Sequence, residues 1–172
     1  MPVIIGTGSF LLFMSLTMNV VSLLVPYWYV VKSTGSLDKN YGLWGSCTCG
    51  WYYTSLGSAI DDNKIEDWFK SAQVLYALAV FLIVVSSTMV FIAACLRDNI
   101  YSKVAKAAGS LMIIAGVLGS IAIIVFGTKG SSDFGLSVSG NYRFDWGLWI
   151  GVAGIFFNII CAIFFLVQGF RR

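Results

Sequence analysis

The chain of 172 residues contains no histidine, and only 11% of its residues carry a charge. Histidine is the commonest general base and the commonest metal ligand, so its absence argues against hydrolytic enzymes and metal centres. Soluble domains average about 25% charged residues. With 58% hydrophobic residues, the composition predicts a membrane protein that is not an enzyme and that binds neither a cofactor nor a metal.

Four long stretches lack Asp, Glu, Lys and Arg altogether: 3–25, 71–95, 107–126 and 146–167. Each is long enough for the roughly 20 apolar residues that a transmembrane helix needs. The first stretch has no preceding cation and no small-x-small cleavage site after it, so a span is favoured over a signal peptide. We therefore predict one four-span domain over residues 1–172, with outer loops 26–70 and 127–145 and an inner loop 96–106. Ionisable groups inside spans usually mark ion or proton paths, and these spans have none.

The distribution of cations predicts the orientation. Arg97, Lys103 and Lys106 lie in the loop between the second and third spans, and the chain ends in Arg171 and Arg172. Positive residues concentrate on the cytosolic side of membrane proteins, so both termini are predicted to be cytosolic, with the plasma membrane as the expected location. The net charge of +3 then reflects topology and gives no reason to expect a nucleic-acid partner.

Polar and small residues inside the spans predict how the helices pack. Asn19, Gln73 and Asn158 could bond a neighbouring helix or line a pore, and the first role is favoured. Small residues recur four positions apart in three pairs, Gly147 and Gly151, Ala105 and Gly109, and Ala115 and Gly119. Such spacing allows close backbone approach within one bundle or between molecules, and packing within the bundle is favoured.

The first outer loop has the composition of a small antiparallel sheet. Segments 27–33, 41–49 and 51–55 are rich in Tyr, Trp, Val and Thr, and turn-forming residues separate them. Residues 61–69 look helical and lead into the second span. Three strands alone are marginally stable, so we expect Trp28, Trp44 and Trp51 to anchor the sheet on the helix ends.

The four cysteines divide between the loop and the spans. Cys47 and Cys49 are the only pair predicted to lie outside, where thiols oxidise, so a Cys47–Cys49 disulfide is the candidate bridge. Cα atoms two residues apart on a regular strand lie near the upper limit for a disulfide, so this bridge requires a bend or stores strain. A zinc site is the rival reading, but two thiolates cannot complete a tetrahedral shell. Cys95 is either a palmitoylation site or a packed small residue.

These features together resemble a known family. Trp28, then Gly42-Leu43-Trp44, then Cys47 and a second cysteine are similar to the signature of the claudin and peripheral-myelin-protein superfamily, which includes the epithelial membrane proteins. The resemblance implies a left-handed four-helix transmembrane bundle with a small extracellular antiparallel β-sheet. Gln73 stands where claudins have an arginine, and the short tail lacks the claudin scaffold-binding ligand.

The resemblance implies two functions. The first is claudin-like cell–cell adhesion and paracellular barrier formation, with self-association in one membrane and between opposed membranes. The second is an auxiliary subunit of an ion channel. The acidic group Asp61, Asp62, Glu66 and Asp67 could select cations along an intercellular gap, although a solvated helix N-terminus explains the same charges more simply.

Overall fold

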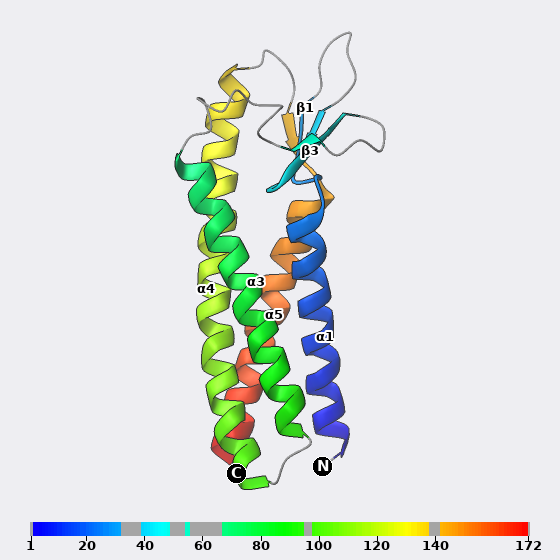
Figure 1. Cartoon of the computed structure of the whole chain (residues 1–172), viewed down its shortest axis with the longest axis vertical. Helices are drawn as coiled ribbons and strands as arrows, with labels where there is room; N and C mark the ends of the chain where they lie inside the picture. The colour runs from blue at the N-terminus through cyan, green and yellow to red at the C-terminus, as the bar shows by residue number, and fades with distance from the viewer. Residues whose placement is uncertain are drawn as a thin grey trace.

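The computed structural model describes residues 2–31, 39–48, 54–55, 67–94, 98–137 and 142–171. Within them, four long helices run side by side, α1 (Pro2–Leu24), α3 (Asp67–Ala94), α4 (Asp98–Ser137) and α5 (Trp146–Arg171). A small sheet lies at one end, which we call the sheet end; α1 begins and α5 ends at the other, the terminal end (Figure 1). All four helices are long and apolar enough to cross a membrane, and the chain is a multi-pass membrane protein.

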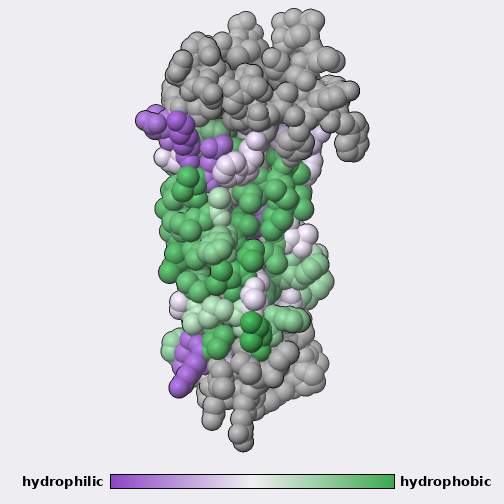
Figure 2. Space-filling model, viewed as in Figure 1, coloured by the Kyte–Doolittle hydropathy of each residue, from purple (hydrophilic) through white to green (hydrophobic). Residues whose placement is uncertain are grey.

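The helices form a ring in which α5 packs against α1 and α4, and α4 packs against α3. Contact between α1 and α3 is the least extensive of the four. Short links between consecutive helices lead us to expect antiparallel neighbours. The structure confirms this for α3, α4 and α5. The outward faces are apolar, with Phe13, Phe81 and Phe156 more than half exposed. Figure 2 shows the resulting hydrophobic band on one face of the bundle, with hydrophilic residues at its margins, as expected for a surface in contact with lipid.

The third helix in the bundle is much longer than its apolar segment. α4 has 40 residues, whereas the charge-free stretch covers 107–126, so the helix takes in most of the expected inner loop and part of the second outer loop. The apolar window that could lie in the membrane runs from Tyr101 to Lys129. Lysine has good helix propensity, so Lys103 and Lys106 interrupt the charge-free sequence without ending the helix.

In the described residues, five short strands make one antiparallel sheet in the order β4-β3-β2-β1-β5. Their bounds are β1 Tyr29–Val31, β2 Lys39–Tyr41, β3 Gly45–Thr48, β4 Thr54–Ser55 and β5 Tyr142–Phe144. The prediction of a sheet is confirmed, but the single strand expected over 41–49 is wrong, because residues 42–44 turn and leave β2 and β3 on either side. The fifth strand was not predicted. It comes from the second outer loop and pairs with β1, so that Tyr29 lies opposite both Tyr41 and Phe144.

The small-residue pairs in the spans make contacts inside the bundle. A Cβ added at Gly109 would approach Leu166 Cγ to 2.8 Å, and one at Gly119 would approach Ile155 Cδ1 to 2.5 Å. Gly147 and Gly151 lie equally close to residues of α1 and its exit. The favoured interpretation, packing within one bundle, therefore describes these glycines.

Candidate functional site

Trp28 joins the sheet to the helix bundle. α1 ends before Pro26, which has no N–H to donate to the Ser22 carbonyl four residues earlier. The indole Nε1 of Trp28 donates to that carbonyl instead, at 2.6 Å. The Trp28 side chain is fully buried, so the chain turns back over the end of its own helix and caps it. This hydrogen bond explains why a tryptophan, rather than another large apolar residue, occupies the position.

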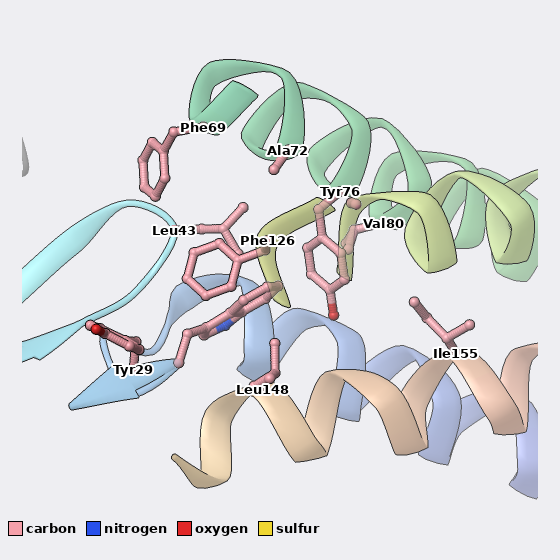
Figure 3. Packing of buried hydrophobic residues seen from close by; sticks show 11 residues of the cluster. Tyr29, Leu43, Phe69, Ala72, Tyr76, Val80, Phe126, Leu148 and Ile155 are labelled. Atoms are coloured by element: carbon pink, nitrogen blue, oxygen red, sulfur yellow. The ribbon is translucent and has the colours of Figure 1, made fainter. Parts of the chain in front are cut away.

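Trp28 lies at the centre of a junction cluster to which α3, α4, α5 and the sheet region contribute. Its ring makes edge-to-face contacts with Tyr76 of α3 (centroids 5.1 Å apart) and Phe126 of α4 (5.0 Å). Figure 3 shows Tyr76, Phe126 and Leu43 converging from different elements. The cluster comprises Trp28, Tyr29, Leu43, Phe69, Ala72, Tyr76, Val80, Ala122, Phe126, Leu148 and Ile155. Aromatic pairs of this geometry add about 0.5–1.5 kcal/mol each beyond burial, so the sheet is held rigidly.

The turn between β2 and β3 is built from the Gly-Leu-Trp motif, and each residue has a different environment. A Cβ at Gly42 would lie 2.5 Å from the Val25 carbonyl oxygen and 2.6 Å from Pro26 Cα, so only glycine fits against this backbone. Leu43 is fully buried in the junction cluster, and its carbonyl accepts a hydrogen bond from Gln73 Nε2 of α3. Trp44, in contrast, is 49% exposed. The expectation that Trp44 anchors the sheet is therefore wrong; Trp28 and Leu43 do so, and Trp51 lies outside the described residues.

The start of α5 is attached to the same exit of α1. Gly147 N donates to the Tyr27 carbonyl at 2.9 Å, and Asp145 N donates to the Trp28 carbonyl at 3.1 Å. Asp145 Oδ1 accepts from Trp146 N at the first turn of the helix, where a carboxylate is favoured by the helix dipole. These bonds join β5 and α5 to the segment that carries Trp28. Two distant parts of the sequence thus form one continuous support beneath the sheet.

Below the junction cluster, α1 and α5 share a polar seam, which we define as Ser15, Asn19 and Ser22 facing Gly147, Gly151 and Gly154. Ser22 Oγ donates to the Gly147 carbonyl at 2.9 Å, and Ser15 Oγ donates to the Gly154 carbonyl at 3.1 Å. All three side chains of α1 are at most 1% exposed. Each bond requires the close approach that glycine permits.

The buried amides bond within the bundle as well. Asn19 Nδ2 donates to the Ser15 carbonyl at 2.8 Å, and its Oδ1 accepts from the Tyr76 hydroxyl of α3 at 3.3 Å. Asn158 Nδ2 donates to the Met112 carbonyl of α4 at 2.7 Å. Both amides are at most 1% exposed, which supports a packing role over a pore-lining one.

The aromatic residues near the ends of the helices at the sheet end divide into two groups. Trp28, Tyr29 and Phe69 are buried in the junction cluster. Trp146 and Trp149 are 44% and 62% exposed, and Trp146 stacks on Tyr27 with ring centroids 5.1 Å apart. This exposed pair at the start of α5 is suited to the headgroup region.

The sheet has a face that points away from the bundle. Tyr41 and Phe144 pack against the junction cluster that contains Tyr29, so by strand alternation Asn40 and Arg143, which flank Val30 in register, point to the other face. Arg143 is exposed. Burial raises the pKa of the Tyr41 phenol above its ordinary value, so this phenol stays neutral at physiological pH. β4 and β5 are the outermost strands of the described sheet.

The cysteine and acidic candidates are described only in part. Cys47 lies in β3, where its Cα pairs with Asn40 of β2. Asp67 is exposed at the first turn of α3. Cys49, Asp61, Asp62, Glu66 and Cys95 lie outside the described residues. The disulfide and the acidic group therefore stay predictions. Cys161 is a buried free thiol within α5.

Comparison with known families agrees with this architecture. The model of the PMP-22/EMP/MP20/Claudin tight junction family matches residues 13–167. The chain belongs to this family. A search of curated proteins found no match. The match runs from the middle of α1 to the last turns of α5 in this claudin-family chain. It includes Trp28, Gly42, Leu43, Trp44 and Cys47.

Several residues that build the site were not singled out from the sequence. Ser22 and Ser15 belong to the polar seam, Phe126 packs on Trp28, and Asp145 accepts a hydrogen bond from the first residue of α5. One signal was available in the sequence: Pro26 leaves the Ser22 carbonyl without its helical donor, which calls for a replacement nearby. The pairing of β5 with β1 joins residues more than 110 positions apart, and local sequence carries no comparable signal for it.

Proposed function

We propose that this protein is a claudin-like adhesion and barrier protein of the plasma membrane, with the sheet outside the cell and both termini in the cytosol. The orientation rests on charge. Lys103 and Lys106 lie near the terminal end of α4. In the sequence, Arg97 directly precedes α4, and Arg171 and Arg172 follow Phe170 near the end of α5. Cations are enriched on cytosolic ends of spans, which puts the sheet on the opposite, extracellular side.

The observation that carries the proposal is the rigid mounting of the sheet on the bundle. Trp28, Gly42 and Gln73 join it to α1, α3 and α4 through buried or close contacts. A recognition surface that is ordered before binding loses less conformational entropy when it meets a partner. The outer face with Arg143 and the outermost strands β4 and β5 provide polar groups and strand edges for pairing with further copies. In this proposal, copies associate side by side and across the gap between cells.

The test is imaging of tagged protein in cells that lack junctions. We expect enrichment at contacts between two expressing cells and no enrichment where only one cell expresses. The charge reversal Arg143→Glu should reduce that enrichment, because it changes the outer face of the sheet. The matched control is Lys70→Glu, a reversal at an exposed lysine that belongs to α3 and to no sheet strand; its enrichment should stay normal.

The alternative outcome is equally informative. Uniform distribution of a correctly delivered protein would overturn the adhesion proposal. Co-purification with a channel at fixed stoichiometry would then favour the auxiliary-subunit function. Turnover of a substrate by the purified chain would contradict both functions, since each is non-enzymatic.

A further inference from the structure

The terminal end of α4 and α5 carries a second group of residues that the adhesion proposal does not use. Lys106 lies against α5, and a Cβ added at Gly169 would come within 2.6 Å of its Cγ. Ser102 Oγ donates to the Gly169 carbonyl at 2.8 Å, which fixes this crossing. The Lys106 ammonium lies 4.7 Å from the centre of the Phe170 ring. The aliphatic stem is thus packed between helices while the charged group is presented at the surface.

In the described part of the chain, little negative charge lies near Lys106 to balance its positive charge. Lys103 is exposed three residues before Lys106, so the two ammonium groups share one side of α4. The acidic side chains that the structure describes, Asp67 and Asp145, belong to the sheet end, where α3 and α5 begin. In sequence, Arg171 follows Phe170 directly, and Asp98 is the one acidic residue near this group. The charge therefore favours an anionic ligand.

The surroundings favour a lipid over a free anion. On α5, the surface next to the lysines is apolar, with Phe170 74%, Val167 44% and Ile163 55% exposed. These side chains continue from the position of the ammonium groups along the helix toward the membrane interior. A phospholipid could place its phosphate at the lysines and its acyl chains along this surface. Basic pockets between transmembrane helices on the cytoplasmic side commonly bind anionic headgroups.

We propose that Lys103 and Lys106, together with the Ser102–Gly169 crossing and Phe170, form a binding site for an anionic phospholipid. The site is separate from the sheet, and it does not depend on the adhesion function. Lysine binds phosphate as a point charge, so the site reads headgroup charge more than headgroup shape. The bound lipid fixes the terminal ends of α4 and α5 in the leaflet.

The test uses the full chain purified in dodecylmaltoside and titrated with dioleoyl-phosphatidylserine or dioleoyl-phosphatidylcholine, with bound lipid counted by native mass spectrometry. Phosphatidylserine should bind more tightly. The double variant Lys103→Gln with Lys106→Met keeps an apolar stem over Gly169 and removes both charges. At about 1 kcal/mol per basic residue near an anionic surface, its affinity for phosphatidylserine should fall about 25-fold.

Two controls keep the test interpretable. Lys70→Gln removes an exposed lysine at the sheet end and should leave binding unchanged. Lys103→Gln alone changes an exposed side chain and should weaken binding about five-fold. This single variant covers the case in which the double variant fails to fold. Equal binding of the two lipids, full binding by the double variant, loss in the Lys70 control, or displacement of phosphatidylserine by inorganic phosphate would each overturn the proposal.

Discussion

Replacing Trp28 by alanine tests whether this buried residue, and not the exposed aromatic residues near it, anchors the sheet on the bundle. The side chain is fully buried, it contacts Tyr76 and Phe126, and its Nε1 satisfies the Ser22 carbonyl. Removing a buried tryptophan costs about 3–5 kcal/mol. A buried carbonyl left without a donor costs about 1–3 kcal/mol. The two contributions overlap, so we expect a loss of at least about 4 kcal/mol in the free energy of unfolding.

Trp44→Ala is the matched control, because it deletes the same side chain from the same sheet. Trp44 is 49% exposed, so about half of the burial energy is at stake, roughly 2 kcal/mol. Trp28→Phe is a third variant, which keeps a ring in the junction cluster but removes the indole donor; it should lose about 1–3 kcal/mol. The series separates ring packing from the capping hydrogen bond.

The assay is denaturant titration of the purified chain in detergent micelles, followed by far-ultraviolet circular dichroism so that the loss of a tryptophan does not change the signal. Surface delivery in cells gives a second readout, since a destabilised variant is retained. Equal losses for Trp28→Ala and Trp44→Ala would refute the reasoning that burial at the junction decides stability. A Trp28→Phe variant as stable as the parent would refute the role of the hydrogen bond to Ser22.

Three further predictions concern the glycines and the cysteines. Gly42→Ala places a Cβ against backbone that cannot move independently, so the variant should fail to reach the cell surface even at low expression. Gly151→Ala, which meets the buried seam at 2.5 Å, should lose about 1–3 kcal/mol in the same titration. Its control Gly127→Ala has open space around it and should gain up to about 1 kcal/mol from helix propensity. Alkylation before reduction should leave Cys47 and Cys49 unlabelled in the mature protein; labelling of both thiols would show that the predicted bridge does not form.

The four helices could be predicted from the sequence because lipid imposes a requirement that is local. Every backbone polar group in the hydrocarbon must be satisfied within its own segment, so an uncharged stretch such as 71–95 is sufficient evidence for a helix. The ends were less predictable, because a lysine that stops a helix from entering lipid does not stop the helix itself. α4 therefore begins at Asp98, nine residues before the expected apolar stretch 107–126, and contains Lys103 and Lys106.

The sheet was harder to predict than the helices, because its strands depend on partners far along the chain. β1 has two partners in the described sheet, β2 about ten residues away and β5 more than 110 residues away. The composition of residues 27–33 gives no indication of the pairing with β5. Which tryptophan would be buried was likewise set by the exit of α1. Trp28 follows Pro26 and can reach back to Ser22, whereas Trp44 follows Leu43, which occupies the buried position itself.

The placement of polar groups explains how the fold is stabilised both among the helices in lipid and at the sheet end. In lipid, apolar side chains give no net advantage to contact between helices, so close packing and hydrogen bonds must hold α1 against α5. The polar seam supplies both through Ser15, Ser22 and the glycines opposite. At the sheet end the balance changes, and aromatic burial around Trp28 becomes the main stabilising term. Gly147 belongs to both regions, since its carbonyl accepts from Ser22 and its N–H donates to Tyr27. Loosening the seam near Gly147 should therefore loosen the sheet too, so the order of the sheet depends on how the helices pack.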